Sequence, residues 1–156
     1  MLYYSAPELE AMFEQRGTVS GVAALGGKKS DEERSPFLHV VELTEDRLVI
    51  LRDADPRELR PGALWSGPSL VTLVDGSAFL MAMAHLPPGS DALTMDLSMQ
   101  FLRGAPFGEL RAELRMLRMG KRAIVMSADV TSEAVPDGPV CHATTTFAPR
   151  LAGAPT

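Results

Sequence analysis

The segment that most constrains the fold is an apolar run between Ser66-Gly67-Pro68 and Pro87-Pro88-Gly89. Proline suits the first turn of a helix, where its missing N–H would have no partner, and Pro-Pro-Gly ends a helix. Between these signals most residues are apolar, so a helix from about Pro68 to Leu86 has almost no solvated face. A helix that is apolar nearly all round is a buried one. The sequence therefore predicts a long central helix enclosed by the rest of the chain.

Strand-like segments lie on both sides of this helix. FLHVVEL and RLVILR precede it as a hairpin, and ALTMDLSMQFLR, ELRAELRML, AIVMSADVTS and VCHATTTF follow it. The first of the later four alternates strictly, which places its apolar and polar residues on opposite faces. The apolar set is Leu93, Met95, Leu97, Met99 and Phe101, and the polar set is Thr94, Asp96, Ser98 and Gln100. This order predicts an α+β fold in which an antiparallel sheet is wrapped around one central helix.

The ends of the chain are expected to be accessory. Ser5 and Glu8 have the spacing of a capping box, which starts a short helix over about 6–16. A loop over 17–36 follows it. We therefore divide the chain into an N-terminal helix and loop over 1–36, the main domain over 37–149, and a disordered tail over 150–156.

Composition excludes several classes of function. The net charge of −5 argues against nucleic-acid binding, which needs a basic face. The N-terminus has no leader pattern, and no apolar run reaches the roughly 18 residues of a membrane span. Cys141 is the single cysteine and the three histidines have no ligand spacing, so we expect no metal site. A cytoplasmic protein without a membrane or nucleic-acid partner is the expectation.

One carboxylate, Asp75, lies in the middle of the apolar helix, where it would be costly to bury without a partner. Ser69 and Thr72 precede it at helical spacing, and we expect the three to form one wall of a cleft. The N-terminus of the helix offers free N–H groups to a developing oxyanion. Because Pro68 has no N–H, Gly67 is the obvious donor, and Asp75 is the obvious general base or nucleophile.

The distance between these two residues predicts a dimer. Eight helical residues span about 12 Å. Gly67 and Asp75 of one chain therefore cannot both reach one carbonyl group and the water that attacks it. Two antiparallel helices across a twofold axis would bring Gly67 of one chain beside Asp75 of the other. We therefore expect a homodimer or a homotetramer.

Three motifs and the order of elements give the chain a family resemblance. SGPSLVTLVD, TMDLSMQFLRGAP and MGKRAIV resemble the motifs of the hotdog-fold acyl-CoA thioesterases of the phenylacetate-degradation (PaaI) type, over about 37–149. In that family His-Gly-Gly usually opens the helix. Here Ser66 replaces the His and Pro68 the second Gly, a form that is familiar within the family. Gly104 replaces a usual Pro, and Arg60 falls near a position where many members carry Asn.

The resemblance implies a hotdog fold, hydrolysis of an acyl-CoA with no separate cofactor, and two sites per dimer at the interface. It implies catalytic roles for Gly67 and Asp75, and for Thr94 a role in holding the catalytic water, although a solvent-facing strand hydroxyl is an equal alternative. Contacts to substrate are expected from residues around the start of the helix and from turn cations, which otherwise are ordinary surface charges. These residues are Ser66, Pro68, Ser69, Thr72, Arg103, Lys121 and Arg122.

Two alternatives remain open. Because Ser66 and Pro68 depart from His-Gly-Gly, the chain is alternatively a non-catalytic hotdog protein that binds acyl-CoA or an aromatic acid. A hydratase or dehydratase is the weaker alternative. Those enzymes usually pair a His with a carboxylate near the helix, and in this chain Ser66 stands at the position of the His. Ser66 itself is more simply explained as a hydroxyl at the helix start than as a catalytic group.

Overall fold

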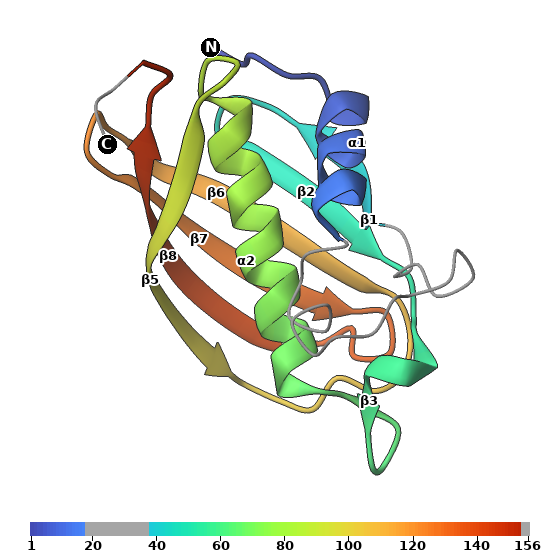
Figure 1. Ribbon diagram of the computed structural model, residues 1–156. Coiled ribbons are helices and arrows are strands. Elements are labelled where there is room, and N and C mark those ends of the chain that lie inside the picture. Colours follow the sequence, from blue (N-terminus) through green and yellow to red (C-terminus); the bar gives the residue numbers. More distant parts are fainter. Residues whose placement is uncertain (18–37, 154–156) are drawn as a thin grey trace, which may run out of the picture.

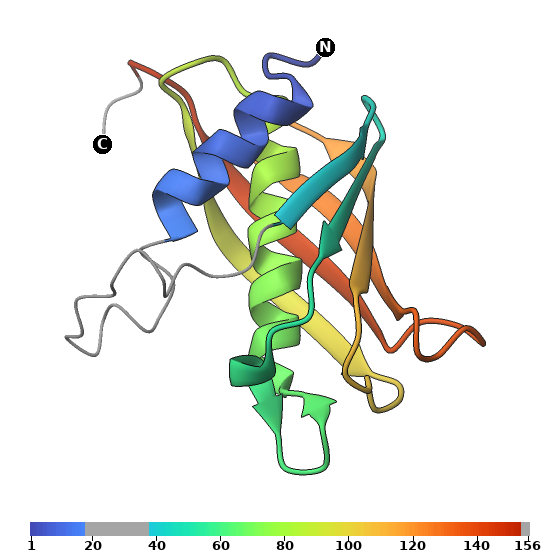
Figure 2. The ribbon, with the colours of Figure 1, turned by 90° about the vertical axis from the view of Figure 1, so that its right-hand side faces the viewer.

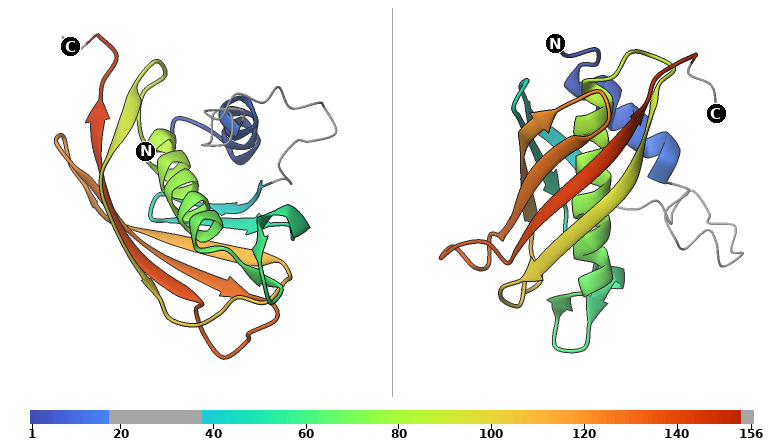
Figure 3. Two further views of the ribbon diagram at one scale, coloured as in Figure 1. Left: turned by 60° about the horizontal axis from the view of Figure 1, so that its bottom comes forward. Right: turned by 90° about the vertical axis from the view of Figure 1, so that its left-hand side faces the viewer.

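The computed structural model describes residues 1–17 and 38–153. The loop predicted over 17–36 therefore lies outside the described residues, apart from Gly17, as do residues 154–156 of the predicted tail. Six strands form one antiparallel sheet in the order β1-β2-β6-β7-β8-β5, which curves around helix α2 (Figures 1 and 3). The strands are β1 (Leu38–Leu43), β2 (Arg47–Arg52), β5 (Asp91–Phe101), β6 (Leu110–Met119), β7 (Ile124–Ser132) and β8 (Cys141–Arg150). The predicted α+β architecture is confirmed.

Helix α2 (Gly67–Ala84) is the centre of the core, with Ser66 as its N-cap and His85 as its C-cap. Its fully buried side chains, among them Leu73, Leu80 and Met81, pack against the inner face of the sheet. Each such side chain contributes about 1.5–3 kcal/mol to stability. With a mean hydropathy of 1.3, this helix is long and apolar enough to cross a membrane, contrary to the sequence-based expectation, but 56% of it is buried inside the fold. It has the character of a core helix.

Helix α1 (Ala6–Gly17) covers the β1 edge of the sheet and crosses α2 (Figure 2). The Ser5 N–H donates to Glu8 Oε2 at 2.7 Å, as the capping-box spacing predicts. Leu9 is fully buried, and the Val40 N–H of β1 donates to Glu10 Oε1 at 2.5 Å. One edge of the sheet is therefore closed by a helix, while β5 is the other edge.

Strand β5 departs from the predicted strict alternation. A bulge between Thr94 and Asp96 leaves Met95 without a partner on β8. Thr94 is opposite Phe147, which is buried in the core, whereas Asp96 is opposite Thr146 on the outer face. The prediction that Thr94 shares a face with Asp96 is therefore wrong. Periodicity could not show this, because one unpaired residue reverses the alternation from that point on.

The connection between β2 and α2 contains structure that periodicity did not indicate. It folds into a 3₁₀ turn η3 (Pro56–Glu58) and a small hairpin of β3 (Leu59–Arg60) and β4 (Leu64–Trp65). The hairpin extends below the N-terminus of α2 (Figure 1). At the other end of the chain, β8 continues to Arg150, and the Ala152 N–H donates to Ser90 Oγ at 3.2 Å.

Candidate active site

The structure brings Asp75 and Thr94 together. Asp75 lies on the half-buried side of α2 that faces β5, and the Thr94 hydroxyl donates to its Oδ1 at 2.9 Å. The β-bulge at Met95 makes this contact possible because it turns Thr94 towards the helix. A hydrogen bond from an uncharged hydroxyl to a carboxylate orients the carboxylate and leaves its other oxygen available. The pair lies at the open edge of the sheet, where a substrate or a second chain has access.

Gly67 is the first residue of α2, and its N–H makes no hydrogen bond to any of the described residues. A free N–H at the positive end of a helix is suited to an oxyanion. A Cβ at Gly67 would lie 3.8 Å from the ring of Phe101, an ordinary contact, so Phe101 is the neighbour of Gly67 on that side. Phe101 is 54% exposed. Sequence reasoning assigned this ring to an apolar strand face and missed its place beside Gly67.

The polar stripe predicted on α2 does not form one wall. Ser66 Oγ accepts from the Ser69 N–H at 3.2 Å and lies 2.7 Å from Ser69 Oγ, so both hydroxyls are engaged at the helix start. Thr72 is exposed and its hydroxyl donates to the Pro68 carbonyl at 2.9 Å. Each step of three residues turns the side-chain direction by about 60°, so Ser69 and Asp75 point about 120° apart. Of this stripe, Asp75 is the member that faces β5.

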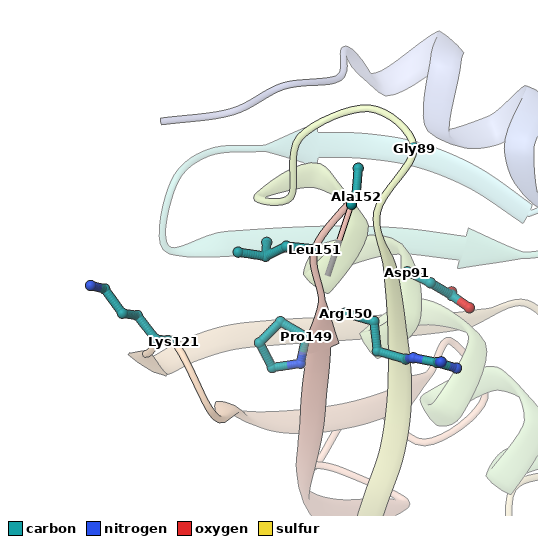
Figure 4. A pocket seen from close by; sticks show the side chains of 8 residues that line it. Gly89, Asp91, Lys121, Pro149, Arg150, Leu151 and Ala152 are labelled. Carbon is teal, nitrogen blue, oxygen red and sulfur yellow. The ribbon is translucent and has the colours of Figure 1, made fainter. Parts of the chain in front are cut away.

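The cations predicted to meet coenzyme A lie at opposite ends of the molecule. Arg103 follows β5 near the N-terminus of α2, and its guanidinium donates to the Asp137 carbonyl at 3.2 Å. Lys121 and Arg122 are exposed in the turn between β6 and β7. Lys121 is at the rim of a hollow beyond the C-terminal end of α2 (Figure 4). This hollow is lined by Gly89, Asp91, Lys121, Pro149, Arg150, Leu151, Ala152 and Gly153. A single chain therefore does not bring the three cations together.

Other reactive side chains are engaged elsewhere. Burial, together with the charge of Asp129, raises the pKa of the Cys141 thiol to about 12, so this thiol is protonated and inert at neutral pH. His85 contacts two backbone carbonyls at the C-terminal end of α2, and His142 contacts Asp129 on the outer face of the sheet. Within the described ranges, no three His, Cys, Asp or Glu side chains are grouped as a metal site requires. Asp75 thus has Thr94, and no histidine, beside it.

Comparison with known proteins agrees with this geometry. Residues 62–137, which include α2 and the strands β5, β6 and β7, match the family described as the thioesterase superfamily. This match covers just under half of the chain, and that part of the chain is similar to the thioesterase superfamily. A comparison with curated protein sequences gave no significant match.

Solved structures place this chain in the hotdog fold. A putative thioesterase from Silicibacter sp. TM1040 shares 25% identity, with 96% of this chain and 94% of that chain covered and a TM-score of 0.75. A thioesterase from Haemophilus influenzae shares 18% identity over 99% and 98% of the two chains, with a TM-score of 0.76. A hypothetical thioesterase from Streptococcus pneumoniae, solved with coenzyme A, shares 20% identity over 74% and 91%, with a TM-score of 0.64. The predicted wrapping of a sheet around one helix is thus the hotdog fold.

Proposed function

We propose that this protein is an acyl-CoA thioesterase of the PaaI type, in a Ser-Gly-Pro form, that hydrolyses a thioester to a free acid and coenzyme A. The observation that carries the proposal is the Asp75–Thr94 pair at 2.9 Å on the open side of α2, with the free Gly67 N–H at the start of the same helix. The similarity of residues 62–137 to the thioesterase superfamily supports thioester hydrolysis in general. The coenzyme A found with the Streptococcus pneumoniae neighbour supports that class of thioester.

The residues divide the reaction between them. As a general base, Asp75 takes a proton from water while the water oxygen bonds to the thioester carbonyl carbon. The carbonyl oxygen becomes an oxyanion and accepts a hydrogen bond from the Gly67 N–H. When the tetrahedral intermediate collapses, the C–S bond breaks and the proton passes to the leaving sulfur. The Thr94 hydroxyl keeps the Asp75 carboxylate oriented during these steps. Direct attack by Asp75 on the carbonyl carbon as a nucleophile is the other route to the same products.

A second chain completes this site. Strand β5 is an edge of the sheet, and its residues Leu93, Met95 and Phe101 are 44%, 66% and 54% exposed. An apolar strand edge that is left open is a template for pairing. Antiparallel pairing of two β5 strands would align two α2 helices in opposite directions and bring Gly67 of the partner subunit towards Asp75.

The same pairing accounts for the separated cations. Strand β5 begins beside the hollow that Lys121 lines and ends before Arg103. In an antiparallel pair the beginning of one β5 lies beside the end of the other. The turn that carries Lys121 and Arg122 would then share one end of the dimer with Arg103 of the partner subunit, where the phosphates of one coenzyme A have cations from both chains.

Release of free thiol from short, medium, long and aromatic acyl-CoAs tests the function, with Asp75→Asn as the variant. Asparagine still accepts the Thr94 hydrogen bond but has no basicity. We expect turnover to fall about 10²- to 10⁴-fold. Binding of the acyl-CoA should survive or tighten, because a negative charge that repels the anionic ligand is removed, and the melting temperature should stay near that of the wild type.

Two results would contradict the proposal. Full hydrolysis by folded Asp75→Asn protein would leave the mechanism without its base. Binding without hydrolysis by the wild type, for every acyl-CoA in the series, would favour the non-catalytic acyl-CoA or aromatic-acid binding protein. The cytoplasmic location and the association of dimers into a tetramer stay predictions from the sequence.

A further inference from the structure

A buried cation lies close to the start of α2. Arg52 is the last residue of β2, follows Leu48 and Ile50 on the inner face of the sheet, and is 3% exposed. Its guanidinium forms an ion pair with Glu58 and lies 5.7 Å from the centroid of the Trp65 ring, within range of a cation–π interaction. Its Nε has no hydrogen-bond partner among the described residues. A buried ion pair is often no more stabilising than apolar side chains of the same volume, so stability alone does not account for Arg52.

Glu58 links this cation to the first residues of the helix. Its side chain binds Arg52, while its backbone carbonyl accepts from the Ser66 N–H at 3.1 Å and from the Ser69 hydroxyl at 3.5 Å. Ser66 is the N-cap of α2, and the next residue is Gly67. A continuous series of contacts therefore joins β2 to the residue that precedes the proposed oxyanion donor.

The 3₁₀ turn that carries Glu58 is itself fixed by charge. Asp55, which is 4% exposed, caps η3 by accepting from the Arg57 N–H at 2.9 Å. Burial by itself would raise the pKa of Asp55, but hydrogen bonds from Arg57 and the charge of Arg52 hold it below its usual value. Asp55 is therefore charged at neutral pH. The ion pair between Arg52 and Glu58 connects this turn to the end of β2.

Trp65 holds the helix start from the other side. It is 2% exposed, its N–H donates to the Ala105 carbonyl at 2.8 Å, and its indole Nε1–H donates to the Gly108 carbonyl at 3.1 Å. The Arg52 guanidinium lies over the same indole ring. Ser66 is thus held between Glu58 and Trp65, and both contact Arg52.

We propose that Arg52 is a positioning residue for thioester hydrolysis, which through its ion pair with Glu58 and its contact with Trp65 sets the position of the Gly67 N–H. The inference rests on the proposed function. A first-turn N–H has no helical hydrogen bond to hold it, so the residues around it must fix its direction. Oxyanion stabilisation depends on donors placed within a few tenths of an ångström, and a 1 Å displacement can cost about a hundredfold in rate.

The test compares Arg52→Met with Arg47→Met. Methionine keeps apolar contact with Trp65, and Glu58 is 22% exposed in its side chain, so water can solvate the carboxylate that loses its partner. Arg47 begins the same strand but lies on the opposite face, where it pairs with Glu42 at 2.9 Å and Glu113 at 2.8 Å. It is the matched control, because its substitution also removes a guanidinium ion pair from β2. Assays are run well below the melting temperature of each variant.

We expect Arg52→Met to lower kcat about tenfold or more with little change in KM, because the donor is displaced while the binding surface is kept. Arg47→Met should lower the melting temperature and leave kcat unchanged. Arg52→Lys, which restores a cation beside Glu58, should recover part of the loss. The backbone amides of residues 64–73 should exchange hydrogen faster in Arg52→Met than in Arg47→Met. This measurement does not depend on enzymatic activity.

Equal kcat values and equal exchange rates for the two Met variants would overturn the positioning role. The positioning role would also be overturned if Arg52→Lys had a kcat no higher than that of Arg52→Met, because a cation beside Glu58 would then have no effect on catalysis. Loss of kcat in both Met variants to the same extent would assign the effect to general destabilisation. A wild type that hydrolyses no acyl-CoA would overturn the proposed function together with this role, and that outcome is distinct from an active wild type with an equally active Arg52→Met.

Discussion

At the scale of single residues, the proposed chemistry depends on one backbone group and one carboxylate. The carboxylate of Asp75 is held by Thr94, and the N–H of Gly67 is free because it belongs to the first turn of α2. Neither group needs a histidine beside it. This division of roles fits a helix start in which Ser66 acts as the N-cap.

Substitution of Gly67 tests the oxyanion donor. A Cβ there would meet only the Phe101 ring, at 3.8 Å, so Gly67→Val is expected to fold with a melting temperature near that of the wild type. The isopropyl group would keep the thioester carbonyl away from the N–H. We expect turnover to fall about 100- to 1000-fold, as when one oxyanion donor is lost. Unchanged turnover in a folded protein would place the oxyanion elsewhere.

At the scale of secondary-structure elements, the bulge in β5 decides what faces α2. Because Met95 is unpaired, Thr94 lies on the inner side with Leu97 and Met99, and Asp96 lies on the outer side. A strand without this bulge and with strict alternation would have put Thr94 and Asp96 on the same face.

Thr94→Val tests this element because it removes the hydroxyl but keeps the branched shape that suits a strand. Loss of a hydrogen bond to a charged group corresponds to about a ten- to hundredfold lower turnover, with little change in stability. Thr144→Val is the control, since it is the same substitution on the outer face of β8. If both variants hydrolyse acyl-CoA at the wild-type rate, the Thr94 hydroxyl has no part in the reaction.

At the scale of the whole molecule, the two edges of the sheet differ. The β1 edge is covered by α1, whereas β5 presents exposed apolar side chains along an unpaired edge. Figure 3 shows β5 at the open side of the curved sheet. A dimer through β5 would bury these side chains, and we expect it because Gly67 and Asp75 lie about 12 Å apart along one helix.

Met95→Lys tests the dimer by placing a charge on the open edge. Met95 is 66% exposed in the single chain, so the fold of the monomer should survive. Sedimentation at micromolar concentration should show a wild-type dimer or tetramer and a Met95→Lys monomer without turnover. Leu117→Lys, at a 57% exposed position on β6, should remain at least dimeric and active. A monomeric wild type that hydrolyses acyl-CoA would rule out the shared site.

The sequence by itself determined the parts that depend on local signals. The central helix follows from its apolar residues and from the proline and glycine at its ends, and the paired strands of β1 and β2 follow from their spacing around a short turn. Gly67 and Asp75 were candidates from sequence because helical geometry fixes their separation. These features are set by interactions between residues near each other in the chain.

Tertiary structure alone decided the features that depend on pairing between distant segments. The register of β5 on β8 creates the bulge and turns Thr94 to Asp75, and no pattern within β5 reveals it. Arg52 ends a strand-like segment and Glu58 lies in the polar connection that follows it, and folding buries the Arg52 side chain beside the start of α2. Arg103 and Lys121 likewise lie at opposite ends of β5, because Lys121 shares a hollow with Asp91 at the beginning of that strand. Contacts of this kind form between segments that are distant in sequence. Their free energy depends on which segments pack together in the complete core.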